Sequence, residues 1–495
     1  MGEKSSSDQS VVQRNRRFIR EANPAKGPSK PGRRQEQKAP EPVSCDLITI
    51  MLRHWFPDWN QWLDALPDPR RQEFCTYSIR HLVMLGLSMF VFQSGSRRQL
   101  RGDRQGATFL SNFLQLTGTN EETVADPDTM NYLLERMKPS GLELIVVKTA
   151  RTLIRSKSLD QFRFGGSVII GVDATELFRS KKQHCEKCLK AKHSDTSTSY
   201  FHRVLEAKLL TENGMAISLA SEFIENAEDG YYKKQDCELK AFYRLAPKVK
   251  KYFPRMRILL VLDGLYANQH VLDICESYSW EYIIVFKEGS LPNLYKEAIR
   301  QRNRYPKKSL KTKTQSFSWA HNLDYAGHTL HAIFTKDLND PDNGKFEFIT
   351  DIRPHSGNIE NLINKGGRRR WKIENEGFNA QKTGGYELEH GYGRNSFAWK
   401  NYYYLLQLAH LLNQLMTKTD LFGKLQLQWL LKNTTKATGV LLKFVVASAL
   451  TFYRSIKNFV KRLGESFRYQ PFTELGSSMD YPRSIQIRFT PFDTS

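Results

Sequence analysis

Residues 168–177 read VIIGVDATEL, an apolar run interrupted by an acidic residue, Asp173. Four more short runs rich in β-branched or apolar residues follow it: VLEAKLL (204–210), GMAISLASEFI (214–224), RILLVLDGLY (257–266) and YIIVFK (282–287). A stretch with helical periodicity, residues 233–253, separates the third run from the fourth. We therefore expect three successive strands, then a helix, a strand, a helix and another strand, which is an α/β order.

This order is the one expected of an RNase H-like sheet, in which a meander of three strands is extended by crossover units. Further strand-like pieces between residues 288 and 360 (TQSFSWAHNLDY, HTLHAIFT and KFEFITDI) break the order before a helix resumes near Asn361. We interpret them as a β-rich insertion, 288–360, within an RNase H-like catalytic domain at 161–395.

The flanking regions differ from this core in composition and in the spacing of their apolar residues. Residues 1–43 alternate charge with proline and carry almost no apolar residues, which predicts a disordered basic arm. Residues 44–160 space their apolar residues three and four apart, which predicts a helical domain and, in a DNA enzyme, the natural place for sequence recognition. Residues 396–495 are predicted to form a mainly helical C-terminal region.

The formal net charge is +22, from 74 Lys and Arg against 52 Asp and Glu. Such an excess favours a polyanionic partner, because each neutralised phosphate releases counterions. DNA or RNA is favoured, and an anionic membrane surface or ribosomal RNA is the plainer alternative. No run reaches the roughly 18 apolar residues of a membrane helix, and no signal peptide is evident. Six cysteines in 495 residues do not make a disulfide framework, so we expect a reducing cytoplasm.

Two aspartates stand at the ends of predicted strands. Asp173 ends the first strand and Asp263 the fourth. An acidic side chain at such a place costs desolvation energy unless it is paired, hydrogen-bonded or bound to metal. Either one alone could be a helix N-cap or part of a turn. Their positions on two strands of one sheet favour a common site, since strand ends are where ligands and metals bind.

A third acid comes from RRRWKIENEGFNAQK (368–382). On an ideal helix with about 100° per residue, one arc of about 120° holds Arg370, Trp371, Glu374, Phe378, Gln381 and Lys382. Glu376 lies on the opposite side. We therefore choose Glu374 over Glu376, a choice that requires a regular helix. The alternative is a simple surface pair between Arg370 and Glu374.

Three carboxylates suit Mg²⁺ or Mn²⁺, which prefer oxygen ligands. Two such ions about 4 Å apart can clamp an in-line displacement at phosphorus. No nucleophilic side chain is then needed, and the sequence has no Ser–His–Asp pattern.

Four motifs together resemble a known family: VIIGVDATELF (168–178), KQDCELKAFYRL (234–245), LLVLDGLYANQHVL (259–272) and RRWKIENEGFNAQKTGGYELEH (369–390). They are similar to the DDE transposases of bacterial insertion sequences, in the branch with a β-strand insertion, over roughly residues 45–415. The resemblance implies that Asp173, Asp263 and Glu374 bind two Mg²⁺ or Mn²⁺ ions. It also implies a homodimer or larger synaptic complex on terminal inverted repeats and target DNA, in a bacterial cytoplasm and associated with the nucleoid.

A signature of this branch places Tyr, Arg, Glu and Lys around the third acid, separated by two, three and six residues. Arg370 and Glu374 match it, Gly367 stands at the Tyr position, and Lys382 comes one residue late. The resemblance implies that Arg370 and Lys382 position phosphates. In relatives, a tryptophan of the insertion can stack on a base flipped out of the duplex. Trp319 would take that role here, or it packs under its own small sheet.

A cysteine–histidine cluster lies between the first two predicted strands. KKQHCEKCLKAKH (181–193) contains His184, Cys185, Cys188 and His193, and His202 follows nine residues later. Zn²⁺ takes four N or S ligands, so a structural zinc site is one interpretation, and reduced cysteines in a basic loop are the other. Lysines of this loop would then contact DNA phosphates: Lys181, Lys182, Lys187, Lys190 and Lys192.

The sequence thus predicts a transposase that cleaves the ends of an insertion sequence and joins the 3′-OH to target DNA. A metal-dependent DNA nuclease on the same core is one alternative. A catalytically silent DNA-binding protein derived from a transposase is the other.

Overall fold

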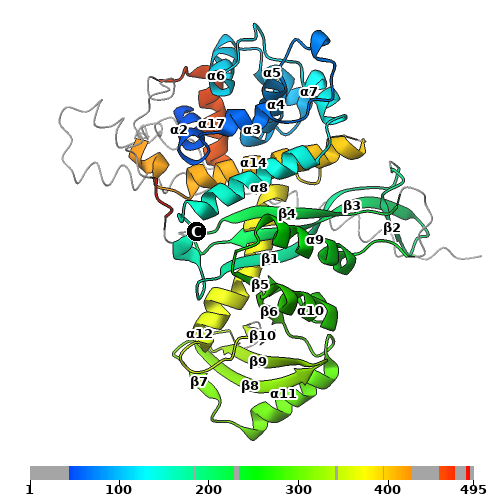
Figure 1. Ribbon diagram of the computed structural model, residues 1–495, viewed down its shortest axis with the longest axis vertical. Coiled ribbons are helices and arrows are strands. Elements are labelled where there is room, and N and C mark those ends of the chain that lie inside the picture. Colours follow the sequence, from blue (N-terminus) through cyan, green and yellow to red (C-terminus); the bar gives the residue numbers. More distant parts are fainter. Residues whose placement is uncertain are drawn as a thin grey trace, which may run out of the picture. The chain divides into compact units, whose positions relative to one another are not determined.

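The computed structural model describes residues 44–182, 184–227, 234–340, 344–393, 395–425, 456–473 and 487–490 (Figure 1). These residues belong to one compact unit, Pro42–Ser495. The predicted basic arm, 1–43, lies outside the described residues, as does much of the predicted C-terminal helical region.

The described residues form a mixed α/β fold around a ten-stranded mixed sheet. Its strands are β1 (Val168–Ser180), β2 (Leu189–Lys192), β3 (Thr198–Leu210), β4 (Ala216–Ile224), β5 (Ile258–Leu262), β6 (Glu281–Val285), β7 (Ser309–Lys311), β8 (Gln315–Tyr325), β9 (His328–Asp337) and β10 (Lys345–Thr350). The order across the sheet is β2-β3-β1-β5-β6-β10-β9-β8-β7, and β4 pairs with β3.

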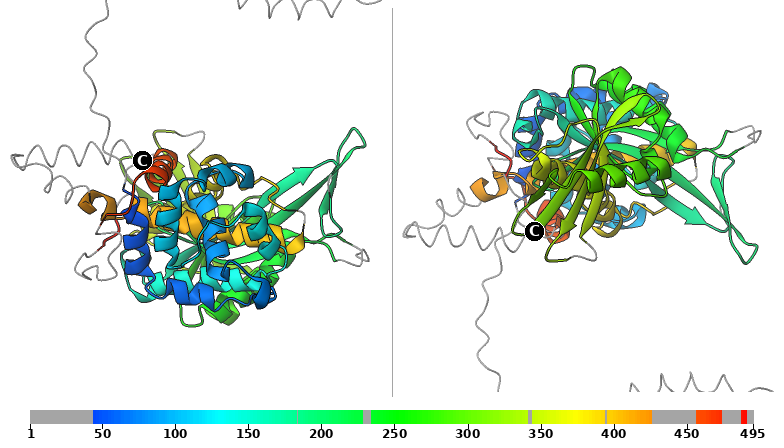
Figure 2. Two further views of the ribbon diagram at one scale, coloured as in Figure 1. Left: turned by 90° about the horizontal axis from the view of Figure 1, so that it is seen from above. Right: turned by 90° about the horizontal axis from the view of Figure 1, so that it is seen from below.

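The predicted order of strands and helices is present. β1, β3 and β4 are antiparallel neighbours, while β5 and β6 run parallel to β1. Helix α9 (Glu238–Tyr252) connects β4 to β5, and α10 (Gln269–Tyr278) connects β5 to β6. All five residues of β5 are buried, as expected for a parallel strand in the middle of a sheet. The short strand β2 was not predicted; it pairs with the outer part of β3, and this hairpin extends beyond the helices (Figures 1 and 2).

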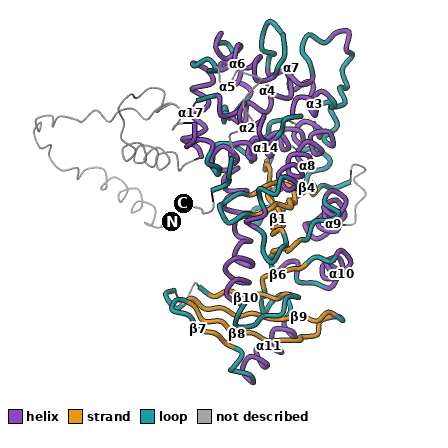
Figure 3. Tube along the Cα trace, turned by 60° about the vertical axis from the view of Figure 1, so that its left-hand side comes forward, coloured by secondary structure: helices purple, strands orange, loops and turns teal. Residues whose placement is uncertain are grey.

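The strand-like pieces between residues 288 and 360 form β7 to β10, with α11 (Pro292–Arg304) before them. They do not make a separate sheet, because β10 pairs antiparallel with β6, with Phe348 opposite Val285. The strands therefore lie side by side as a continuation of the main sheet (Figure 3). This pairing satisfies the backbone groups of β6 and buries Phe348 and Ile349.

Residues 44–160 are helical, as predicted. The helices are α2 (Asp46–Trp55), α3 (Trp59–Asp64), α4 (Ile79–Val91), α5 (Arg97–Asp103), α6 (Ala107–Thr117), α7 (Pro127–Leu134) and α8 (Ser140–Arg155), with short 3₁₀ turns η1 (Gln72–Phe74) and η2 (Asp160–Phe162). Within the described part of the chain, no helix is long and apolar enough to span a membrane.

Helix α14 (Ser396–Thr417) lies between the N-terminal helices and the sheet, in contact with α4 and with β4 (Figure 1). It is buried along nearly its whole length, and two of its asparagines bond to the N-terminal helices. Asn401 donates to the carbonyls of Leu134 and Met137, and Asn413 donates to that of Val91. Helix α17 (Ile456–Tyr469) packs against α6 and α14.

The segment that carries Glu374 is not the regular helix that was predicted. Its pieces are α12 (Ile359–Asn361), a π-helical turn η4 (Leu362–Gly366), a 3₁₀ turn η5 (Gly367–Arg370), a π-helical turn η6 (Ile373–Asn379) and α13 (Ala380–Thr383). The segment changes from a π-helical to a 3₁₀ turn at Gly366 and Gly367, where it lies against the sheet. A methyl group on Gly366 would lie 2.7 Å from Ile283 Cδ1, and one on Gly367 would lie 2.8 Å from Phe348 Cζ. The backbone thus approaches the sheet more closely than any side chain would allow.

Candidate functional site

Asp263 directly follows the last residue of β5, as predicted. Asp173 does not end its strand, because β1 continues to Ser180 through its pairing with β3 and sets Asp173 opposite Glu206. The parallel pairing of β1 and β5 includes Gly171 opposite Val261, and each aspartate comes two residues further along its strand. Asp263 still has extended backbone angles, φ −77° and ψ 166°. Residues in register on paired strands project from the same face. The two carboxylates therefore stand beside each other on one face of the sheet.

Gly171 brings the third acid to that face. A methyl group on Gly171 would lie 2.7 Å from Leu210 Cδ1 and 3.5 Å from Ile373 Cβ. The absence of a side chain lets the π-helical turn η6 rest on β1, so Glu374, which follows Ile373, is held next to Asp173.

The charges around Asp173 change its pKa. Its pKa is raised to about 7, first by burial and then by the negative charge of Glu238, with a further contribution from Glu374. The Ala174 N–H, which donates to Asp173 Oδ1 at 2.9 Å, and the cation of Arg370 act in the opposite direction. Asp173 thus lies in a concentration of negative charge that lacks a full counter-charge.

Glu238 is a member of this group that sequence reasoning missed. It is the first residue of α9, where an acidic side chain is ordinary because it complements the helix dipole, so nothing in the pattern distinguished it. Its Oε1 accepts a 2.8 Å hydrogen bond from the Tyr266 hydroxyl, and its Oε2 lies 3.2 Å from Arg203 Nη2. The quoted motif KQDCELKAFYRL contains it, which was the available signal.

Two cations accompany the acids. Arg370 Nη1 lies 3.3 Å from Glu374 Oε1, and the arginine is only 7% exposed. Lys287 Nζ lies 3.5 Å from Asp263 Oδ1. Glu376 pairs instead with Lys372, at 2.9 Å. Of Glu374 and Glu376, only Glu374 contributes to the raised pKa of Asp173. The structure therefore favours Glu374 as the third acid, although the regular helix on which that choice depended is not present.

The carboxylates are near one another but not closed into a tight cage. Among the described residues, only one group of three His, Cys, Asp or Glu side chains has all its ligand atoms within 4.8 Å, and it contains none of these acids. The Asp263 and Glu374 side chains are 38% and 43% exposed, so both have room to rotate.

Two predicted DNA contacts lie elsewhere. Lys382 Nζ pairs with Glu389 Oε1 at 2.8 Å. Trp319 is on β8, opposite Ile333, and is 6% exposed within the hydrophobic core. Its ring is therefore not available for stacking on a base in this conformation, which favours the packing alternative. The sheet under which it packs is the main sheet rather than a small one of its own.

Of the five predicted zinc ligands, the structure brings together three: Cys185, Cys188 and His202. The other two histidines have different partners. The His184 ring stacks on Tyr200 with centroids 4.1 Å apart, and His193 Nε2 lies 2.9 Å from Ser199 Oγ. A hydrogen bond from the Cys188 side chain, with His202 close by, lowers the pKa of the Cys185 thiol below its usual range.

The predicted DNA-contacting lysines of this loop include Lys181 and Lys182, and both are exposed. Lys181 Nζ lies 3.7 Å from Asp195 Oδ2. A surface pair of this kind contributes little to stability, so it leaves Lys181 able to contact an anion.

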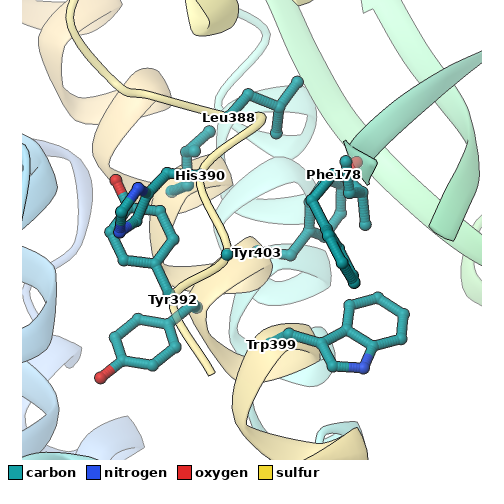
Figure 4. A pocket seen from close by; sticks show the side chains of 10 residues that line it. Phe178, Leu388, His390, Tyr392, Trp399 and Tyr403 are labelled. Atoms are coloured by element: carbon teal, nitrogen blue, oxygen red, sulfur yellow. The ribbon is translucent and has the colours of Figure 1, made fainter. Parts of the chain in front are cut away.

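A small apolar pocket lies between β1 and α14. Phe178 and Trp399 face Leu388, His390 and Tyr392 across it (Figure 4). Its volume of about 20 Å³ has room for little more than one water molecule. It is therefore packing space rather than a substrate site.

No protein-family model matches this chain, and no curated protein matches it. The interpretation of the site therefore depends on its own geometry and chemistry.

Proposed function

We propose that this protein is a DNA transposase whose active site consists of Asp173, Asp263 and Glu374. The observation that carries the proposal is the placement of two in-register aspartates and a helix-borne glutamate on one face of the sheet. That donor set, all oxygen and all anionic, fits Mg²⁺ or Mn²⁺.

The strand arrangement supports an RNase H-like core. Five strands follow the order β4-β3-β1-β5-β6, with an antiparallel meander on one side and two parallel crossover strands on the other. We propose that β7 to β10 are the insertion of the branch that the motifs resemble, placed before the segment that carries the third acid.

The raised pKa of Asp173 supports a cation site. Burial and the neighbouring charges of Glu238 and Glu374 disfavour the ionised form of Asp173 when no cation is bound. Asp173, Asp263 and Glu374 would hold two divalent ions, which supply the activated hydroxyl and the charge stabilisation of a phosphoryl displacement. Arg370 holds Glu374 through its ion pair, and a phosphate could reach the buried Arg370 guanidinium only if neighbouring side chains moved.

The partners follow from charge. A net charge of +22 favours DNA, and we propose that terminal inverted repeats and target DNA are bound by a homodimer or larger synaptic complex. We further propose that it works in a bacterial cytoplasm, on DNA of the nucleoid.

The test is a strand-transfer assay with pre-cleaved DNA ends taken from the sequences that flank the gene. We expect joined products in Mg²⁺ and none in EDTA. Asp173→Asn, Asp263→Asn and Glu374→Gln should each abolish joining, whereas Glu376→Gln, a matched acid two residues from Glu374, should retain it.

Cleavage of uncut ends without any joined product would instead assign a nuclease. A wild-type protein that binds these ends and neither cuts nor joins them would assign a catalytically silent DNA-binding protein.

A further inference from the structure

A second cluster of side chains lies at the base of the β2–β3 hairpin, away from the carboxylates. His202 Nε2 is 3.2 Å from Cys185 Sγ and 3.4 Å from Cys188 Sγ, and the two sulfurs are 3.5 Å apart. Cys188 and His202 are buried. Residues from a loop and from β3 thus converge on one point.

The opposite edge of the His202 ring faces a carboxylate. His202 Nδ1 lies 3.9 Å from Glu225 Oε1, and each of these two atoms is buried without a hydrogen-bond partner. Glu225 is oriented by Lys400 of α14, whose Nζ lies 2.5 Å from Oε2. With a small closing movement Glu225 would accept a hydrogen bond from Nδ1–H, which sets the tautomer in which Nε2 can bind a metal. Nε2 already faces the two sulfurs.

We propose that Cys185 Sγ, Cys188 Sγ and His202 Nε2 bind a zinc ion. With Zn–S bonds of about 2.3 Å and Zn–N bonds of about 2.0–2.1 Å, tetrahedral geometry separates the sulfurs by about 3.8 Å and each sulfur from the nitrogen by about 3.6 Å. The observed separations are within a few tenths of an ångström of these values. Soft sulfur ligands select Zn²⁺ over the Mg²⁺ that suits the carboxylate site.

The fourth coordination position of the zinc ion would face a cavity of about 340 Å³. Cys185 and His202 line it together with His184, Glu389 and Trp399. The His184 ring is stacked on Tyr200, so a water molecule from the cavity would complete the coordination of the zinc ion.

The ion would join three elements. Its ligands come from the loop before β2 and from β3, so the ion would link these two elements. The link to α14 is indirect: Lys400 pairs with Glu225, and the Trp399 ring centroid is 4.5 Å from that of His202. The basic loop with Lys181 and Lys182 is thereby fixed to the body of the protein. This site does not depend on the proposed transposase function.

The first test measures the metal content of full-length protein purified under reducing conditions. We expect about one zinc per chain. Cys185→Ser and Cys188→Ser each remove one of the three protein ligands, so each should lower the zinc affinity at least about tenfold and leave the purified protein with little zinc. Cys75→Ser, which changes a cysteine of the helical region, and His184→Ala should retain it. Circular dichroism shows whether each variant is folded.

A second test keeps the wild-type ligands. Co²⁺ added to metal-free protein should give the visible spectrum of a tetrahedral ion with thiolate ligands. Glu225→Gln should weaken zinc binding about 10–100-fold, whereas Lys400→Met, which breaks the ion pair but keeps the carboxylate, should weaken it less.

The proposal is overturned if wild-type protein holds no zinc and gives no such Co²⁺ spectrum. A Cys185–Cys188 disulfide in place of free thiols would also overturn it, as would zinc retained in folded Cys185→Ser and Cys188→Ser variants.

Discussion

Asp173 and Asp263 each stand two residues beyond Gly171 and Val261, which are paired on the adjacent parallel strands β1 and β5. The register of one pair of strands therefore sets the spacing of two acids that are 90 residues apart in sequence. Because a shift of one residue would turn either side chain to the other face, the site depends on this register. The negative charge gathered on that face sets the behaviour of Asp173 and Glu238.

Replacing Asp173 with Asn should stabilise the metal-free protein at pH 8. An acid whose pKa is raised on folding binds more protons in the folded state, so its stabilising contribution is lost as the pH rises from the unfolded value of about 4 to about 7. At pH 8 the buried charge is destabilising, and the amide removes it. We expect a gain of about 1–3 kcal/mol in the free energy of unfolding.

Urea unfolding in EDTA at several pH values measures this gain. It should shrink as the pH is lowered toward 4, where wild-type Asp173 is itself neutral. Mg²⁺ should stabilise the wild type and not the variant. An Asp173→Asn protein less stable than the wild type at pH 8 would contradict the electrostatic account.

Replacing Glu238 with Gln should weaken Mg²⁺ binding about tenfold. Glu238 is the charged neighbour with the largest effect on Asp173, so its removal lowers the negative potential that attracts a cation. Titration of the metal-free protein with Mg²⁺, followed by calorimetry, measures the affinity. Tyr266→Phe is the matched control, because it removes the 2.8 Å hydrogen bond to Glu238 and keeps the charge. Equal losses in the two variants would show that Glu238 acts only by holding the local structure.

The order of strands could be predicted because each core strand is a short apolar run between polar turns. The β2 strand, LKAK, could not, since it is recognisable only from its pairing with β3. The irregular helical segment could not be predicted for the same reason. Gly366 and Gly367 lie close to Ile283 and Phe348, which is a contact between distant parts of the chain that local sequence does not reveal.

The site was predictable to a similar extent. The apolar run before each acid identified Asp173 and Asp263 from local sequence. Only Asp263 stands at a strand end, because the pairing of β1 with β3 carries β1 past Asp173 to Ser180. Local sequence could not show which histidine lies beside Cys185 and Cys188. His202 lies 17 residues from Cys185 and still contacts it, since β3 returns alongside β1, whereas the adjacent His184 turns toward Tyr200.

Replacing Trp319 with Ala should destabilise the protein by about 3–5 kcal/mol. The ring is buried on β8 and packs in the core, so its removal leaves a cavity. Thermal or urea unfolding measures the loss. Phe74→Ala, which removes an exposed aromatic ring, is the control and should change stability little. If Trp319→Ala kept wild-type stability but lost DNA cleavage, base stacking would be the better account.

Replacing His410 with Gln should make the protein less sensitive to acid. His410 is buried on α14, with the Gln381 and Gln414 amide nitrogens at 2.9 Å and 2.8 Å from its ring nitrogens. Burial, with a smaller effect from the nearby Lys208 cation, lowers its pKa to about 3. The folded protein thus keeps this ring neutral while the unfolded chain binds a proton below about pH 6.5.

A base whose pKa is depressed on folding contributes stability that is complete above the unfolded value and is lost as the pH falls toward the folded value. Between pH 7 and pH 5, the wild type should therefore lose about 2 kcal/mol more unfolding free energy than His410→Gln. Urea unfolding at the two pH values measures the difference. His355→Gln, which replaces an exposed histidine, should follow the wild type, because that ring is in contact with water whether or not the chain is folded. Parallel losses in the wild type and His410→Gln would mean that the folded state admits a proton at His410, and that the polar contacts around α14 rearrange to accept it.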